Sequence, residues 1–293
     1  MSEFNSEKML QGRTAIITGA SHGLGFEIAS KYVFSGASVV ICAREEEALY
    51  RARKALEQIA TAEQKVASRV TDVSCDEDVR ELIGFTVQLL GHIDILVNNA
   101  GVYGPKGPVE RIDWEEWVRA ININLLGSVL MCRAVVPHMK KQEYGKIVQL
   151  SGGGATNPLP NLSAYAVGKA GIVRFIETLA MEVAEYSIDA NAVAPGALNT
   201  RMLDEIIDSG PTSVGQSFYA KALEQKASGG AGLEKGSELA VYLGSAASDG
   251  ISGKLISAIW DPWVNLAEYR SELNGSDIYT LRRIVPEDRG AEW

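Results

Sequence analysis

Long apolar runs are scarce in this sequence of 293 residues. The most hydrophobic helix candidate, Ile121–Met139, is interrupted by Asn124, Arg133 and Pro137. Residues 1–11 are polar and lack the apolar centre of a signal peptide. We therefore expect a soluble, cytoplasmic protein without a membrane partner.

Basic residues and cysteines are also few. The chain has 28 lysines and arginines against 37 aspartates and glutamates, which gives a formal charge of −9. Nucleic-acid binding needs a concentrated positive surface, so this balance argues against a nucleic-acid partner. Cys42, Cys75 and Cys132 lie far apart and lack the spacing of metal ligands. They are predicted to be buried, reduced thiols, and no metal site is expected.

Short apolar runs alternate with helical segments along most of the chain. Strands are predicted at 15–17, 38–42, 66–70, 93–97, 146–150, 190–193 and 255–259, and helices from 26 and at 45–60, 77–90, 114–139, 165–185 and 235–245. This alternation is typical of an α/β protein with a parallel sheet covered by helices on both faces. Without an internal repeat, the pattern predicts a single domain over residues 1–260.

Two segments stand apart from that alternation. Residues 200–228 are polar and punctuated by glycine, which predicts a loop with short helices beyond the end of a strand, where substrates bind in open α/β sheets. Residues 261–293 form a C-terminal extension rich in charged and aromatic residues. The extension is interpreted either as a wrap over the flank of the domain or as an interface.

A glycine-rich turn follows the first predicted strand. The sequence Thr18–Gly25 reads TGASHGLG and leads directly into a helix. Glycines let the backbone approach a pyrophosphate closely, and the free N–H groups of the first helical turn stabilise its charge. The spacing G-x-x-x-G-x-G departs from the commoner G-x-G-x-x-G, yet it still predicts a dinucleotide cradle.

Four motifs together resemble those of the classical short-chain dehydrogenases/reductases over about residues 8–260. They are TGASHGLG at 18–25, NNAG at 98–101, YAVGK at 165–169 and PGALNT at 195–200. The resemblance implies a Rossmann-type doubly wound parallel sheet of about seven strands. It also implies hydride transfer between a nicotinamide cofactor and a small-molecule carbonyl or alcohol substrate.

The resemblance further implies a set of cofactor-binding residues: Gly19, Ser21, His22, Gly23, Leu24, Gly25, Arg44, Asp72, Val73, Asn99, Ala100, Gly101, Tyr165, Lys169, Pro195, Gly196, Leu198 and Thr200. NAD-preferring relatives carry an acid at the end of the second strand. This chain has Ala43 and then Arg44 there, which favours NADP, with NAD still possible. Asp72 fits an adenine contact and, almost equally, a cap of the helix that begins near Cys75.

Tyr165 and Lys169 are the candidate catalytic pair. Four residues apart on a helix, they share one face, so the lysine ammonium is expected to favour the ionised phenol. Tyr165 is then the predicted acid/base. The family's catalytic asparagine matches Asn124, whose implied part is to hold a helix kink and a proton-relay water near the lysine. Asn122 is the weaker candidate.

The loop after the fifth predicted strand departs from the family. Relatives place a catalytic serine thirteen residues before the tyrosine, and that position is Gly152 here. Ser151 is one residue too early and is expected to point away, so Ser151→Ala should cost only a few fold in activity. Backbone N–H groups of 152–154, or water, are expected to compensate. Gly152→Ser should raise activity in an ordinary pocket and lower it where the glycine makes room.

Two functions from different classes remain open on the sequence alone. The first is an NADP-preferring oxidoreductase acting on a carbonyl/alcohol pair. The second is a dinucleotide-binding sensor or scaffold with weak or no redox activity, which the glycine at 152 would favour. The long helices at 114–139 and 165–185 also predict a homodimer or homotetramer, because relatives pair through such helices.

Overall fold

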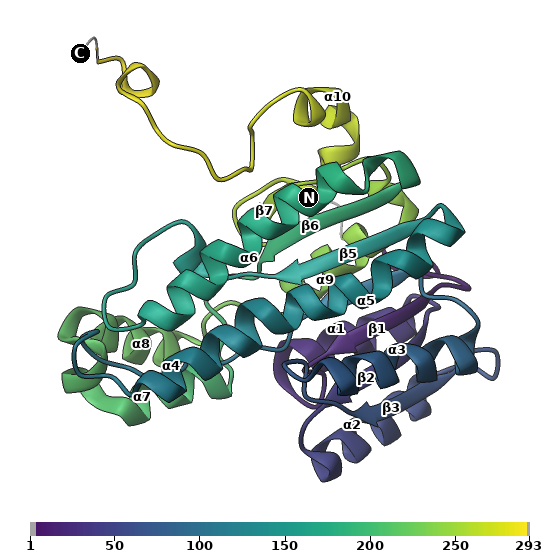
Figure 1. The fold of residues 1–293 in the computed structure, drawn as a ribbon, viewed down its shortest axis with the longest axis horizontal. Helices are drawn as coiled ribbons and strands as arrows, with labels where there is room; N and C mark the ends of the chain where they lie inside the picture. The colour runs from purple at the N-terminus through teal and green to yellow at the C-terminus, as the bar shows by residue number, and fades with distance from the viewer. Residues whose placement is uncertain (1–3, 292–293) are drawn as a thin grey trace.

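A seven-stranded parallel sheet forms the centre of the protein, seen in a computed structural model that describes residues 4–291 (Figure 1). Its strand order is β3-β2-β1-β4-β5-β6-β7. The strands are β1 (Thr14–Thr18), β2 (Ser38–Ala43), β3 (Val66–Val70), β4 (Ile95–Asn98), β5 (Gly145–Leu150), β6 (Ile188–Ala194) and β7 (Leu255–Ser257). The predicted fold class and the number of strands are confirmed.

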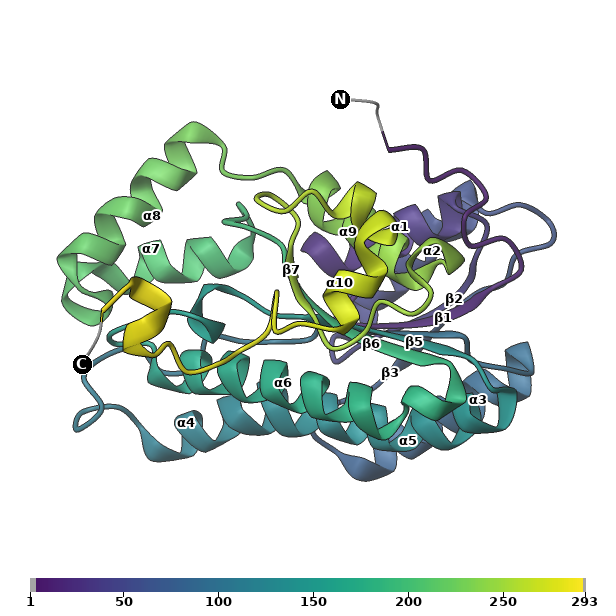
Figure 2. The same cartoon turned by 90° about the horizontal axis from the view of Figure 1, so that it is seen from above.

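Helices cover both faces of the sheet (Figure 2). One face carries α1 (Gly23–Phe34), α2 (Glu46–Ile59) and α9 (Leu233–Gly244), and the other carries α3 (Asp76–Leu90), α5 (Gly127–Gln142) and α6 (Ser163–Glu182). All five residues of β1 are buried, as expected for a strand covered on both sides. Two apolar clusters, one on each face, make up the core.

The strand order reverses between β1 and β4. From β1 the chain builds outward through β2 to β3, then returns to place β4 on the other side of β1. The loops that follow these two strands therefore diverge and leave a crevice at the carboxyl edge, the usual ligand position in such sheets. Both the glycine-rich turn and the NNAG motif lie there.

The predicted helix at 114–139 consists of three parts. It begins as α4 (Trp114–Ile121), passes through a π-helical turn (Asn122–Leu126) and continues as α5. Within residues 4–291 this continuous stretch is the one helix long and apolar enough, by length and composition, to cross a membrane. In the fold, α5 packs against α3, β4 and β5, and α4 packs against α6.

Residues 200–228 contain the expected short helices, with less loop between them than the sequence suggested. They form two helices, α7 (Arg201–Val214) and α8 (Gln216–Ser228), which lie beyond the carboxyl ends of the strands at the left of Figure 1. Gly210, with a φ of 70° and a non-helical backbone, interrupts α7 just before Pro211, so α7 consists of two short helices joined at a kink. The two helices pack on each other and enclose a third apolar cluster that includes Leu203 and Ile206.

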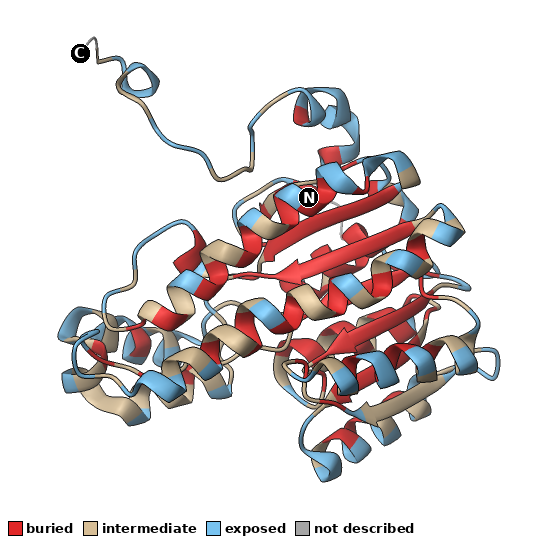
Figure 3. Ribbon diagram, in the orientation of Figure 1, coloured by how far each residue is buried: buried red, intermediate tan, exposed pale blue. Residues whose placement is uncertain are grey.

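The C-terminal extension begins inside the core. Trp263, Leu266 and Leu273 are buried in the same cluster as α1 and α9, and the Trp263 ring packs against Phe4 near the other end of the chain. After α10 (Arg270–Asn274) the chain crosses α6, where the Leu281 N–H donates to Glu177. Its last described turn is mostly exposed (Figure 3).

The cysteine prediction is correct for two of the three residues. Cys42 and Cys132 are buried, and burial raises the pKa of both thiols to about 12. Cys75 is exposed, contrary to the prediction, because it sits at the N-terminal end of α3 on the surface. Among the described residues no group of histidine, cysteine and acidic side chains has the arrangement of a metal site.

Candidate active site

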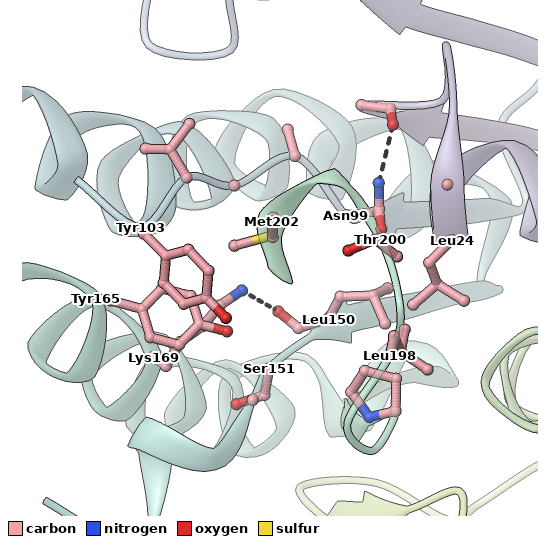
Figure 4. A pocket seen from close by; sticks show the side chains of 18 of the residues that line it. Leu24, Asn99, Tyr103, Leu150, Ser151, Tyr165, Lys169, Leu198, Thr200 and Met202 are labelled. Carbon is pink, nitrogen blue, oxygen red and sulfur yellow. Dashed lines mark hydrogen bonds between the residues drawn. The ribbon is translucent and has the colours of Figure 1, made fainter. Parts of the chain in front are cut away.

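One cavity of about 810 Å³ lies at the carboxyl edge of the sheet (Figure 4). Every residue of the cofactor-binding set named from the sequence lines it, as does Ser151. The cavity extends from the glycine-rich turn and the end of β2, past the NNAG loop, to Tyr165 and the underside of α7 and α8. The motifs that are dispersed in the sequence are thus brought to one place.

The glycine-rich turn has the form of an anion cradle. Gly19 has a φ of 63°, and a Cβ there would come within 2.8 Å of the Ala100 Cα. At Gly25 a Cβ would clash with the Asn99 side chain. The first turn of α1 holds no acidic residue and no side-chain cap, so its N–H groups remain available to a phosphate. These residues fit the pyrophosphate of a dinucleotide.

Asn99 ties this turn to the loop after β4. Its side-chain amide donates to the carbonyl oxygens of Thr18 and Gly19, at 3.0 and 3.1 Å. The Ala100 N–H also donates, to the Thr18 hydroxyl at 3.0 Å. Two loops that diverge from neighbouring strands are therefore held at a fixed separation before any ligand binds.

Arg44 and Asp72 lie at the far end of the cavity from Tyr165. Arg44 is exposed at the end of β2. Burial raises the pKa of Asp72, but hydrogen bonds from Ser74 and the charge of Arg44 outweigh this and hold it below its ordinary value. The Asp72 carboxylate accepts from Ser74, while Cys75 takes the N-cap position of α3. Asp72 is therefore not the cap considered as its alternative role.

Lys169 and Tyr165 share the predicted face of α6. The Lys169 Nζ is buried and donates to the Leu150 carbonyl oxygen at 2.8 Å, and burial lowers its pKa to about 8. Tyr165 differs from the expectation of a lowered pKa. Burial, with a smaller effect from Tyr103, raises the pKa of its phenol above the ordinary value. Four-residue spacing places the two side chains on one face, but it does not determine how much water reaches the phenol.

Asn124 lies behind the cavity wall rather than in it. Its Oδ1 accepts from the Val102 N–H at 2.9 Å, and its Nδ2 donates to the Val102 carbonyl at 2.7 Å. The side chain projects from the π-helical turn, which is the kind of helix irregularity that the resemblance implied. Neither Asn124 nor Asn122 is among the residues that line the cavity.

Gly152 directly faces the Tyr165 hydroxyl. A Cβ built at Gly152 would clash with the phenol oxygen. Ser151 is buried, and its hydroxyl has no hydrogen-bond partner among the described residues. Position 152, thirteen residues before the tyrosine, is thus the position in this loop that faces the phenol, and it carries no side chain.

Several cavity residues were not predicted from the sequence. Tyr103 packs against Tyr165 with ring centroids 4.8 Å apart and an interplanar angle of 53°. Met202, Leu203, Ile206 and Phe218 reach the cavity from α7 and α8, and Trp260 reaches it from the segment after β7. Tyr103 follows the NNAG motif by two residues, so its position in the sequence could have drawn attention to it.

A doubly wound sheet whose crevice holds a glycine cradle and a Tyr–Lys pair with a buried lysine defines a Rossmann-type oxidoreductase architecture. A family model described as short chain dehydrogenase matches residues 13–209. The chain therefore belongs to the short-chain dehydrogenase/reductase family.

Individual relatives agree with this assignment. The chain is 38% identical over 192 residues to the 3beta-hydroxysteroid dehydrogenase 1 of Eggerthella lenta, covering 65% of this chain and 72% of that protein. Among solved structures, an NAD⁺-bound xylitol dehydrogenase is similar with a TM-score of 0.78 at 25% identity, over 85% of this chain and 98% of that one. A gluconate 5-dehydrogenase from Burkholderia cenocepacia, in complex with NADP and tartrate, gives 0.75 at 27% identity, over 86% and 96%.

Proposed function

We propose that this protein is an NAD(P)-dependent oxidoreductase that interconverts a small-molecule carbonyl and an alcohol, with Tyr165 as the acid/base. The observation that carries this proposal is the Tyr165 hydroxyl in the same cavity as the glycine cradle. A bound nicotinamide dinucleotide supplies or accepts the hydride. The chain's own residues bind and orient the two reactants and move the proton.

In the reductive direction Tyr165 gives its phenolic proton to the carbonyl oxygen as charge develops there. The raised pKa of Tyr165 keeps this proton in place until the reaction needs it. Lys169, whose pKa is lowered to about 8, holds its Nζ against the Leu150 carbonyl and fixes one wall of the site. Apolar residues of α7 and α8, among them Met202 and Phe218, line the same cavity.

The cofactor preference proposed here is for NADP. Arg44 is exposed at the cavity wall next to Ala43, with no carboxylate on the Ala43 side chain to repel a 2′-phosphate. Glu45 also lines the cavity, but its carboxylate lies 3.7 Å from Arg201. The solved relatives named above include both an NAD⁺ and an NADP complex, so family membership does not decide between the two cofactors. The proposed preference for NADP therefore rests on Arg44.

We further propose a cytoplasmic homodimer or homotetramer. Val167 and Met181 on α6, and Leu126 at the end of the π-helical turn before α5, are exposed apolar side chains on the helices for which pairing was predicted. Burying such side chains against a symmetry mate would remove them from water. No step of the proposed chemistry depends on this oligomeric state.

The test of the proposed function is a screen of alcohols and ketones with NADP(H) and NAD(H), followed by the Tyr165→Phe variant. Turnover should be lost while cofactor affinity stays within about twofold, because only the ionisable oxygen is removed. Retention of more than about a hundredth of the rate would contradict the acid/base role. Tight dinucleotide binding with no turnover on any substrate would instead favour the sensor function.

A further inference from the structure

The proposed reaction calls for a second hydrogen-bond donor to the reacting oxygen of the substrate, a role that no residue described so far fills. A carbonyl oxygen that becomes negatively charged needs more than one hydrogen-bond donor, and removing such a donor costs roughly 10²–10³ in rate. Position 152, which faces the Tyr165 hydroxyl, is a glycine and offers no side-chain donor. The neighbouring Ser151 hydroxyl is buried without a partner among the described residues.

Tyr103 places a second phenol beside the first. Its ring packs on that of Tyr165 at a centroid distance of 4.8 Å, and both residues line the cavity. Figure 4 shows the two rings adjacent, with their hydroxyl groups directed the same way into the cavity. The two hydroxyl groups are therefore placed to form hydrogen bonds with the same ligand atom.

The loop that carries Tyr103 is held from both sides. Both polar atoms of the Asn124 side chain bond the backbone of Val102, the residue just before Tyr103. Asn99 and Ala100 are bonded to the end of β1. On the other side, the Tyr103 ring packs against the apolar cluster of α7 and α8. The phenol is thus positioned in advance rather than recruited by a ligand.

Tyr103 is suited to hold its proton throughout. Burial, together with the negative charge of Glu205 on α7, raises the pKa of its phenol to about 12. Lys106 is the cation near it, 5.9 Å from the ring centroid and 4.0 Å from the Glu205 carboxylate. A phenol that stays protonated near neutral pH acts as a hydrogen-bond donor and not as a base.

We propose that Tyr103 is a catalytic residue that donates a hydrogen bond from its hydroxyl to the reacting oxygen of the substrate, in place of the serine absent at position 152. This inference rests on the proposed function. During reduction the hydride forms the new C–H bond, the C=O π pair moves to oxygen, and Tyr165 supplies the proton to that oxygen. Tyr103 keeps its own proton and stabilises the charge while it develops.

The test compares Tyr103→Phe with Tyr219→Phe. Phenylalanine at 103 keeps the ring that packs on Tyr165 and removes only the oxygen. Tyr219 lies in the same apolar cluster but is not among the residues that line the cavity, so it serves as the matched control. We expect Tyr103→Phe to lower kcat/KM by 30- to 300-fold, mainly through kcat, and the control variant to stay within twofold.

A second measurement does not depend on turnover. Isobutyramide presents an amide carbonyl oxygen, which is a far poorer hydride acceptor than a ketone, and its binding to the protein saturated with reduced dinucleotide can be measured by calorimetry. Tyr103→Phe should weaken this binding at least fivefold, because one donor to the amide oxygen is lost. Tyr219→Phe should leave it within twofold.

The outcomes separate the two proposals. Tyr103→Phe within threefold of the wild type in both assays overturns the role of Tyr103, as does a hundredfold loss in Ser151→Ala with Tyr103→Phe unimpaired. Loss of isobutyramide binding in Tyr103→Phe, in a protein that turns over no alcohol or ketone, overturns the redox function and upholds Tyr103 as a carbonyl donor. A wild type that neither turns over nor binds isobutyramide overturns both.

Discussion

Replacing Gly152 by alanine should disable the site while leaving the fold intact. The backbone at Gly152 is extended, with a φ of 179°, a conformation that alanine also adopts. The added methyl would clash with the Tyr165 hydroxyl, and the phenol ring cannot simply swing aside because Tyr103 packs against it. The Gly152→Ala substitution therefore acts by displacing the phenol oxygen of Tyr165.

The magnitude follows from the displacement. To reach ordinary van der Waals contact the phenol oxygen must move by roughly 1 Å, and a misplacement of about that size costs on the order of 10²-fold in rate. This equals about 2.7 kcal/mol of transition-state stabilisation. We expect Gly152→Ala to lower kcat about a hundredfold and to leave cofactor affinity within twofold.

Gly153→Ala is the matched control, because a Cβ at Gly153 meets nothing within 4 Å and the residue is exposed. It should keep at least a third of the wild-type kcat. Gly152→Ser should follow Gly152→Ala, since its Cβ meets the same phenol oxygen. Wild-type or higher kcat in both Gly152 variants would refute the reasoning and show that Tyr165 has room to reposition.

Three further predictions concern cofactor, pH and assembly. Arg44→Ala should weaken NADP(H) at least tenfold in fluorescence titrations and change NAD(H) less than twofold; equal affinities in the wild type would remove the basis of the assignment. The pKa of Lys169 is about 8 in the folded protein against ~10.4 in an unfolded chain, so between these values the unfolded state binds more protons. The unfolding free energy of the wild type should therefore rise from pH 8 to 10 relative to Lys169→Met in urea titrations, and a fall would contradict the lowered pKa. Light scattering at micromolar concentration should report a dimer or tetramer, and a monomer would end that proposal.

The sheet could be predicted because its determinants are local. Most strands contain a short apolar run, as in Ser38–Ala43, and the glycine-rich turn indicates both the end of β1 and the start of α1. The residues implied by family motifs meet in one cavity because those motifs follow strands that end at the same edge.

The helices α7 and α8, whose residues line the cavity, could not be predicted in the same way. Gly210, Pro211 and Gly215 suggest interruptions, and the structure has one at Gly210, but the sequence alone does not show that helices follow directly on both sides of it. Helix α7 is stabilised by packing Leu203 and Ile206 against the site, a contact between segments far apart in the chain. Tertiary packing of this kind overrides local propensity.

The chemistry of Tyr165 shows a similar limit. Helical spacing correctly places Tyr165 and Lys169 on one face, but the pKa of the phenol depends on burial by residues from other elements. Tyr103 comes from the loop after β4, and the Leu150 carbonyl that accepts from Lys169 ends β5. None of these contacts is local in sequence, so spacing could predict the pair and not its ionisation.

The contact between Phe4 and Trp263 bears on how the chain is completed during synthesis. Phe4, Tyr242 and Trp263 form one aromatic group, with Phe4 and Trp263 ring centroids 5.1 Å apart. At a translation speed of 5–20 residues per second, about 13 to 50 s pass between the addition of Phe4 and that of Trp263. Throughout that interval the apolar surface that Trp263 covers in the finished fold has no partner, so this part of the core closes only after residue 263 has been made.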